Sequence, residues 1–151
     1  MTTIAVRFST KEMAADTLVS ADGILYNTSK VRKMKTGYVG AAGDWQHVVQ
    51  FFERLPEGKP LENDCNIDAI ELRADGIYVY EQSIVPCRIN QDFFAIGSGC
   101  GYAIAAMHYG KSPKEAVELA VLYDRNTRGP IELFTLGGSN GTTTTRRRKV
   151  T

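Results

Sequence analysis

Strand patterns and helix patterns follow one another in blocks along this chain of 151 residues. Apolar and polar side chains alternate from Thr2 to Phe8, and this period of two predicts a half-buried strand. Shorter strand patterns follow at Glu12–Asp16, Val31–Met34 and Gly37–Ala42, before a helix pattern that starts at Asp44. Three further strand patterns, two helices and a last strand complete the order. Blocks of this kind predict an α+β fold, with two sheets and helices outside them, rather than a βαβ repeat.

The middle of the chain carries a helix and a hairpin. The apolar residues that share one helix face are Trp45, Val48, Val49 and Phe52. Pro56 ends this helix, and residues 57–66 read as a polar loop. The next strand patterns, Ile67–Ala74 and Ile77–Glu81, flank Asp75-Gly76, a pair that suits a tight turn with positive φ at both positions. The sequence therefore predicts a β-hairpin over residues 67–81.

A glycine-rich turn and two helices follow this hairpin. Phe93–Ile96 predicts a buried strand that leads through Gly97–Gly101 into a helix at Tyr102–Tyr109. Ser112–Glu115 is a capping box with proline at the first helical position, so a second helix begins there. Its expected apolar stripe consists of Ala116, Leu119, Ala120 and Tyr123. Ile131–Leu136 predicts the last strand.

The charge of the chain is divided unevenly. The net charge is +1, but residues 137–151 hold four basic groups and no acidic one, which leaves residues 1–136 with 14 basic and 17 acidic groups. We expect one domain over residues 1–136 and a basic, threonine-rich, disordered tail over residues 137–151. The mildly acidic body argues against a nucleic-acid-binding surface.

Other functional classes are excluded by patterns that the sequence lacks. No apolar stretch approaches the roughly 18 residues of a membrane span, and no secretory signal pattern opens the chain, so we expect no membrane contact. Three cysteines without a close pair, Cys65, Cys87 and Cys100, favour reduced thiols in the cytoplasm. These cysteines and the two histidines have no metal-ligand spacing, so the sequence predicts neither a metal nor a cofactor.

Thr2 is the first candidate nucleophile. Methionine aminopeptidase generally removes Met1 when a small residue such as threonine follows it. An N-terminal threonine then holds a nucleophile and a base in one residue, because its hydroxyl attacks while its α-amine, with an ordinary pKa of about 7.7–8.0, accepts the proton. Asp16 and Lys30 are candidates for an ion pair near that amine, although each alone reads as a solvated surface charge.

The glycines at positions 97–101 form the next candidate feature. They lie between a strand and a helix, where Ser98 and backbone N–H groups can hold an anion or a terminal amine, although a plain tight turn fits equally well. Tyr102 breaks the dinucleotide-binding fingerprint, and Gly99 stands where a nucleophile elbow needs serine. Cys100 with His47 or His108 has no nucleophile signature, so a buried thiol is the simpler interpretation.

Five motifs fall in the order found in proteasome β-type subunits. They are Thr2–Arg7, Ala14–Asp16, Ser29–Lys33, Ala41–Asp44 and Ala95–Ala103. From Thr2 to about Leu136 the chain resembles these subunits, and the bacterial proteasome-like HslV family most of all. This resemblance to the N-terminal nucleophile (Ntn) hydrolase superfamily implies a four-layer αββα sandwich and stacked homo-oligomeric rings, hexameric in HslV. It also implies hydrolysis of unfolded polypeptides delivered by an ATP-driven unfoldase.

The resemblance implies a catalytic role for several matching residues. Thr2 corresponds to the catalytic N-terminal threonine, and Lys30 to the lysine that lowers the pKa of the nucleophile. Asp16 corresponds to the acidic residue that orients this lysine. Gly43 corresponds to the glycine whose backbone N–H forms the oxyanion hole.

Three more residues match positions that complete the family's site. Ser98 corresponds to the serine that contacts the terminal amine. Asp124 and Thr127 resemble an Asp-x-x-Ser pair, with threonine in place of serine.

The chain departs from the HslV pattern after its first helix. Residues 56–66 are too short and too broken for the second long helix of that family, so we expect the first helical layer to lack or shorten one helix. That helix pair faces the unfoldase in the family, and its loss argues against a partner of the HslU type. Two alternatives to the peptidase remain. One is a catalytically silent ring or shell protein in which Met1 is retained, and the other is a small-molecule amide hydrolase of the same superfamily.

Overall fold

The structure is a computed structural model that describes residues 2–137. Its strands are β1 (Thr3–Arg7), β2 (Glu12–Ala15), β3 (Leu18–Ala21), β4 (Ile24–Asn27), β5 (Val31–Lys33), β6 (Gly37–Gly43), β7 (Ile67–Arg73), β8 (Gly76–Glu81), β9 (Cys87–Ile89), β10 (Phe93–Gly97) and β11 (Glu132–Thr135). Its helices are α1 (Trp45–Arg54), α2 (Cys100–His108) and α3 (Pro113–Tyr123). The tail expected at residues 137–151 lies outside the described residues from position 138 onward.

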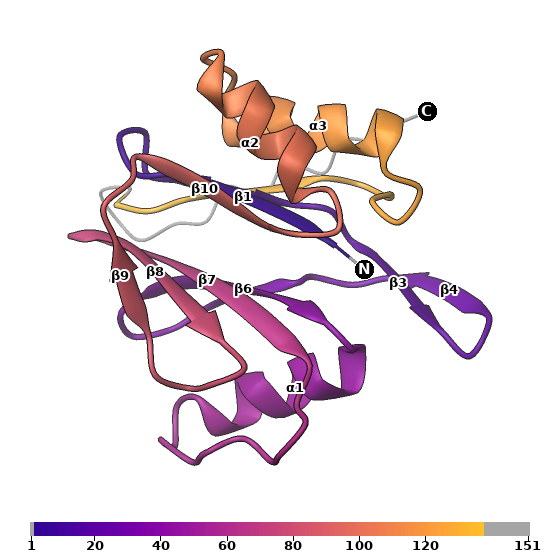
Figure 1. Cartoon of the computed structure of the whole chain (residues 1–151), viewed down its shortest axis with the longest axis vertical. Coiled ribbons are helices and arrows are strands. Elements are labelled where there is room, and N and C mark those ends of the chain that lie inside the picture. Colours follow the sequence, from indigo (N-terminus) through magenta and orange to yellow (C-terminus); the bar gives the residue numbers. More distant parts are fainter. Residues whose placement is uncertain (1, 138–151) are drawn as a thin grey trace.

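The strands form two large antiparallel sheets and one separate hairpin. The first sheet has the order β10-β1-β2-β11, the second has the order β5-β6-β7-β8-β9, and β3 pairs with β4 alone. The two large sheets face each other, with α2 and α3 outside the first sheet and α1 outside the second (Figure 1). This arrangement confirms the expected αββα sandwich.

Three apolar clusters fill the spaces between the four layers. Ile4 and Val6 of β1 pack with Ile70 and Leu72 of β7 between the two sheets. The small residue Ala5 lies on the opposite face of β1 and packs against α2 and α3. Because both faces of β1 are covered, Thr3–Val6 are buried and Arg7 at its end is partly exposed, so the prediction of a half-buried strand was wrong.

The first helical layer consists of α1 alone within residues 2–137. Asp44, where the sequence pattern started the helix, is its N-cap and accepts a hydrogen bond from the Gln46 N–H at 3.0 Å. Residues 55–66 contain no helix, so the chain passes from α1 directly to β7. This confirms the expected loss of one helix from the layer. The buried face of α1 also includes Phe51, which the predicted stripe omitted.

One Asp-Gly pair forms a different turn from the predicted one, and a second pair forms a hairpin that was not predicted. The 67–81 hairpin is present, but its loop is Ala74–Asp75, and Gly76 already pairs with Arg73 without a positive φ. The sequence analysis missed the β3–β4 hairpin, where Asp22 and Gly23 have φ of 51° and 78°, as a tight two-residue turn requires. It also missed the short edge strand β9.

The helices after the glycine-rich turn differ in detail from the predicted ones. Helix α2 begins at Cys100 rather than Tyr102. The capping box of α3 is present, with reciprocal hydrogen bonds between Ser112 and Glu115. Tyr123, placed in the apolar stripe by its spacing, is 66% exposed and instead stacks on Tyr102 at a ring-centroid distance of 5.7 Å.

Candidate active site

Strand β1 places Thr2 at the meeting point of β2, β10 and the β5–β6 sheet. The Asp16 N–H donates to the Thr3 carbonyl at 3.2 Å, and the Thr3 N–H donates to the Asp16 Oδ1 at 3.0 Å. This paired contact fixes the end of β1 against the end of β2. Thr2 itself is 3% exposed, so a residue at the very start of the described chain is held within the fold.

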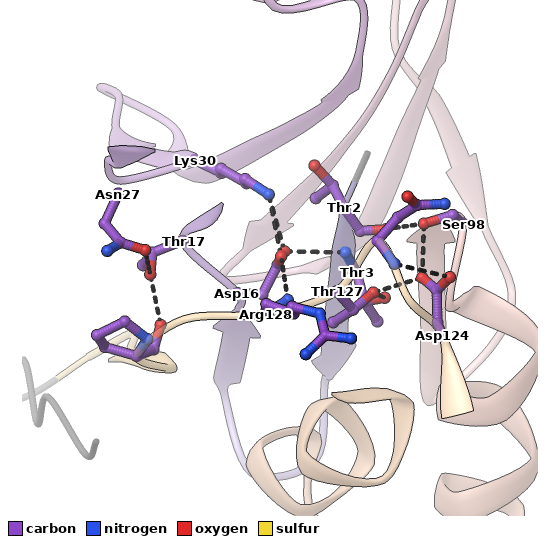
Figure 2. A network of polar contacts seen from close by, with 12 residues as sticks. Thr2, Thr3, Asp16, Thr17, Asn27, Lys30, Ser98, Asp124, Thr127 and Arg128 are labelled. Atoms are coloured by element: carbon purple, nitrogen blue, oxygen red, sulfur yellow. Dashed lines mark hydrogen bonds and ion pairs between the residues drawn. The ribbon is translucent and has the colours of Figure 1, made fainter. Parts of the chain in front are cut away.

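Asp16 and Lys30 form an ion pair that is almost completely shielded from water. The Lys30 Nζ lies 3.0 and 3.1 Å from the two carboxylate oxygens, and the side chains are 1% and 0% exposed. The Arg128 N–H donates to the Asp16 Oδ2 at 3.2 Å (Figure 2). The carboxylate therefore accepts hydrogen bonds from three directions, which determines where the lysine can lie.

Burial acts on both members of this pair. It raises the pKa of Asp16 and lowers the pKa of Lys30, while the attraction between the two charges opposes both shifts. A lysine with a lowered pKa holds its proton less tightly than an exposed lysine does, and it still places positive charge beside Thr2 while it is protonated.

A second polar cluster lies on the other side of Thr2. The hydroxyls of Ser98 and Thr127 each donate to the Asp124 Oδ2 at 2.6 Å, and the Asn126 N–H donates to the other carboxylate oxygen at 3.3 Å. Burial favours the protonated acid, but these hydrogen bonds outweigh it and lower the pKa of Asp124. The group is therefore an ionised acceptor at neutral pH.

The direction of the hydroxyl protons follows from this assignment. An ionised carboxylate only accepts, so the single proton of Ser98 points at Asp124. The Ser98 oxygen also lies 3.4 Å from the Thr2 carbonyl oxygen. Its lone pairs remain available to accept a hydrogen bond from a donor on Thr2. The Ser98 oxygen is thus a hydrogen-bond acceptor close to Thr2.

Two glycines let the polar clusters approach β1 closely. Gly97 has a φ of 95°, and a Cβ there would stand 1.9 Å from the Thr2 carbonyl oxygen. A Cβ on Gly99 would stand 2.1 Å from the Thr3 Oγ1 and 3.0 Å from the Thr127 Oγ1. The glycine-rich turn therefore has a packing role, since a side chain at either position displaces the start of β1.

A cavity of about 800 Å³ opens beside Thr2. Lys30, Gly43 and Ser98 border it together with Thr2, so residues just before β1, just before β5, at the end of β6 and in the turn after β10 meet there. Gly43 has a φ of 131°, and a Cβ there would lie 2.2 Å from the Asn66 carbonyl oxygen. This position therefore favours glycine, as a backbone that must approach a ligand closely often does.

The structure brings all seven residues predicted from the resemblance into one region. Those that border the cavity or support its walls are Thr2, Asp16, Lys30, Gly43, Ser98, Asp124 and Thr127.

The thiol and imidazole candidates do not meet. Cys100 packs at the start of α2 against the α2–α3 cluster. His47 accepts a hydrogen bond from the Asn66 N–H at 2.9 Å, and His108 lies at the end of α2 against Tyr109. None of these three side chains borders the cavity beside Thr2.

Sequence reasoning missed two contributors to the site. Thr3 is fully buried, and its hydroxyl oxygen lies 2.6 Å from that of Thr127. Arg128 acts through its backbone N–H, which no side-chain pattern can reveal. The available signal for Thr3 was its polar character directly before the apolar or small residues Ile4–Val6 of the same strand.

Residues 2–137 contain no cluster of three or more side chains suited to holding a metal ion. Over the same residues, none of the helices has the length and apolar character needed to cross a membrane.

The four layers, with a buried threonine at the start of a central strand, define the class of Ntn hydrolase folds. No family model and no curated protein matches the sequence. Solved structures do match, at a probability of 1.00. BPH from Thiobacillus denitrificans, in complex with epoxomicin, is 16% identical, with a TM-score of 0.69 over 90% of this chain and 100% of that one. HslV from Trypanosoma brucei is 17% identical, with a TM-score of 0.67 over 88% and 99%.

Anbu, an ancestral β-subunit from Yersinia bercovieri, is 11% identical, with a TM-score of 0.70 over 97% of this chain and 86% of that one. The chain therefore has the fold of HslV and related proteasome-like proteins, as its sequence motifs predicted.

Proposed function

We propose that this protein is a threonine-type endopeptidase whose nucleophile is Thr2 after removal of Met1. The observation that carries the proposal is the position of Thr2 at the edge of a cavity, between the buried Asp16–Lys30 pair and the cluster of Ser98, Asp124 and Thr127. One cluster supplies a lysine paired with Asp16, and the other supplies a serine oxygen that can accept from an amine.

The chemistry follows from these positions. The α-amine of mature Thr2 takes the hydroxyl proton while the oxygen forms a bond to the substrate carbonyl carbon. Collapse of the tetrahedral intermediate breaks the C–N bond, and the proton passes from the amine to the departing nitrogen. Water then attacks the resulting ester, which releases the acid and returns the proton to the Thr2 oxygen. Atoms and protons balance without a cofactor.

Each supporting residue has a defined task in this proposal. The Lys30 ammonium stabilises the developing negative charge on the Thr2 oxygen, and Asp16 holds Lys30 in place. The backbone N–H of Gly43 stabilises the oxyanion, a contribution of roughly 3–4 kcal/mol per donor in comparable sites. The Ser98 oxygen accepts from the Thr2 amine and orients its lone pair toward the hydroxyl.

Asp124 and Thr127 are positioning residues in this proposal. Asp124 accepts the Ser98 proton, so the Ser98 oxygen must face the amine as an acceptor. Thr127 holds the same carboxylate oxygen from the other side.

We further propose that the chain assembles into homo-oligomeric rings, stacked in pairs, that enclose the sites and admit unfolded polypeptides. The likeness to HslV and BPH over nearly the whole chain supports this assembly. Within residues 2–137 the first layer holds α1 without the second helix expected of an HslU-facing surface, and this argues against an HslU-type unfoldase partner. Absence of large particles in light scattering would contradict the ring assembly.

The test compares mature wild-type protein with the Thr2→Ala variant on fluorogenic peptides. We expect hydrolysis by wild type only, and we expect epoxomicin to block it. The Thr2→Ser variant keeps a hydroxyl and an amine, so it retains part of the activity. Equal rates for wild type and Thr2→Ala would overturn the proposal.

A catalytically silent ring or shell protein is the second candidate. The observation that favours it is the departure of the first helical layer from the HslV pattern, with α1 alone within residues 2–137. In such a silent protein, an attached Met1 would turn the required amine of Thr2 into an amide. Intact-mass measurement separates the two, because the peptidase is lighter than the full translation product by one methionine. Retention of Met1 together with ring assembly would favour the silent protein.

A further inference from the structure

The cavity beside Thr2 has walls from three separate parts of the fold. The β3–β4 hairpin forms one wall, the end of β6 and the start of α1 form another, and β7 contributes Asp68. Its volume of about 800 Å³ is within the usual range for ligand sites and is ample for a long side chain of a peptide.

The charged side chains of this cavity are predominantly acidic. Asp22, Asp44 and Asp68 border it, and the cation among its lining residues is Lys30. Lys30 is paired with the buried Asp16, so these two charges compensate each other. None of the three lining aspartates forms an ion pair within residues 2–137, and the cavity therefore carries net negative charge.

The three carboxylates that border the cavity come from different elements. Asp22 lies in the turn of the β3–β4 hairpin, and Asp44 caps α1 through one of its oxygens. Asp68 stands directly opposite Glu81 in the β7–β8 pairing. Like charges in directly opposed positions repel, and burial together with Glu81 raises the pKa of Asp68. A bound cation would relieve this repulsion.

Aromatic side chains complete the walls. Tyr26 of β4 and Trp45 at the start of α1 both border the cavity. Aromatic rings cover the aliphatic part of a lysine or arginine side chain and attract its cationic head. Aromatic walls with carboxylates at several points suit a long basic side chain better than an acidic or a short polar one.

We propose that this cavity binds a lysine or arginine side chain of a peptide, so that the protein prefers to cut after basic residues. The proposal rests on the peptidase function for the position of the cut. The binding preference depends only on the cavity, and it is measured separately.

The experiment uses Trp45, the single tryptophan of the chain, as its reporter. The Thr2→Ala variant of the full chain is titrated with three peptides that differ at one position, which is arginine, glutamine or glutamate. Because Trp45 borders the cavity, its fluorescence reports occupancy without turnover. We expect the arginine peptide to bind about tenfold or more tightly than the glutamine peptide, the lower end of what a cleft of one charge sign achieves. The glutamate peptide should bind most weakly.

A variant of the cavity removes its charge while keeping its local structure. Asp44→Ser retains a good helix cap, Asp22→Asn tolerates positive φ, and Asp68→Asn keeps the side-chain shape. The triple variant should lose the preference for arginine, and Asp68→Asn alone should lose part of it. Glu118→Gln on α3 also removes one negative charge, but outside the cavity lining, and should keep the full preference. Raising the salt concentration should reduce the difference in affinity between the arginine and glutamine peptides when the cavity is unaltered.

The outcomes separate this inference from the proposed function. Equal affinities for the three peptides, tightest binding of the glutamate peptide, or full retention of the preference in a folded triple variant would overturn the inference. Preferential binding of the arginine peptide without cleavage by mature wild type would overturn the peptidase function and leave the binding preference standing. Cleavage of all three peptides at the same kcat/KM would support the peptidase and contradict the preference.

Discussion

The hydroxyl oxygens of Thr3 and Thr127 lie 2.6 Å apart, and both side chains are completely buried. The Thr127 hydroxyl donates its one hydrogen bond to the ionised Asp124 carboxylate, so in its contact with Thr3 it must be the acceptor. A directed chain of hydrogen bonds therefore runs from Thr3 through Thr127 to Asp124, where it meets the bond from Ser98. Thr3 is thus linked to the residue that we propose orients the amine of its neighbour Thr2.

Replacing Thr3 by valine removes the first donor of this chain without changing the side-chain shape. We expect a loss of about 0.5–1.5 kcal/mol in the free energy of unfolding. Thr127 still donates a hydrogen bond to Asp124, but it no longer accepts one from the side chain at position 3. If Thr3 positions the site, kcat falls several-fold while KM changes little, and Thr3→Ser restores kcat. Thermal unfolding and steady-state kinetics measure the two effects. Equal kcat for wild type and Thr3→Val would show that the chain is purely structural.

The Asp16–Lys30 pair predicts a separation of stability from activity. Lys30→Met leaves a buried carboxylate without its cation, which costs about 3–5 kcal/mol in the free energy of unfolding. The double variant Asp16→Asn/Lys30→Met removes both charges and should recover most of that stability. It should remain inactive, because no cation lies beside Thr2. Chemical denaturation and peptide hydrolysis provide the two readouts. An active double variant would contradict the role proposed for Lys30.

Local sequence signals accounted for the elements whose formation depends on neighbouring residues. The capping box at Ser112, the helix start at Asp44 and the alternation in β1 each correspond to an observed element. The Asp22-Gly23 turn carried an equally clear signal that was overlooked, whereas Asp75-Gly76 carried the signal but formed a different turn. The pairing register of β7 and β8 determined the turn at Asp75-Gly76, and this register depends on the whole sheet.

The candidate site was predictable to the extent that its residues lie in motifs. The resemblance indicated the residues of the two polar clusters, but spacing along the chain could not show that Asp16 and Lys30 are fully shielded. Contacts made by backbone atoms, such as the Arg128 N–H on Asp16, leave no trace in side-chain patterns. The burial of both faces of β1 likewise arises from four-layer packing rather than from the strand's own alternation.

Asp124 predicts a pH dependence of stability at the acidic end. Burial opposes ionisation, but the hydroxyls of Ser98 and Thr127 hold the pKa of this carboxyl below its ordinary value of 3.8. A carboxyl whose pKa is lower in the folded state contributes stability above the unfolded-state pKa, and this contribution is lost as the pH falls through the folded-state pKa. We therefore expect Asp124→Asn to be less stable than wild type at pH 7 by about 1.5–3 kcal/mol.

The stability difference between wild type and Asp124→Asn should shrink as the pH falls below about 4. Urea denaturation at a series of pH values measures both curves. Glu62→Gln is the control, because the Glu62 side chain is 69% exposed. Removal of its charge should change little in the free energy of unfolding or in its dependence on pH. Parallel curves for wild type and Asp124→Asn down to pH 2.5 would contradict the assignment.

Gly97 and Gly101 form a matched pair for the close approach at Thr2. Both are glycines near the start of α2, but a Cβ on Gly97 would meet the Thr2 carbonyl oxygen at 1.9 Å with φ at 95°, whereas a Cβ on Gly101 would meet open space. Gly97→Ala should cost at least about 1–3 kcal/mol in the free energy of unfolding and displace Thr2, so activity falls as well. Gly101→Ala lies inside α2 and should stabilise the protein by about 0.5–1 kcal/mol with activity unchanged. Similar effects of the two substitutions on unfolding and hydrolysis would show that the turn does not position Thr2.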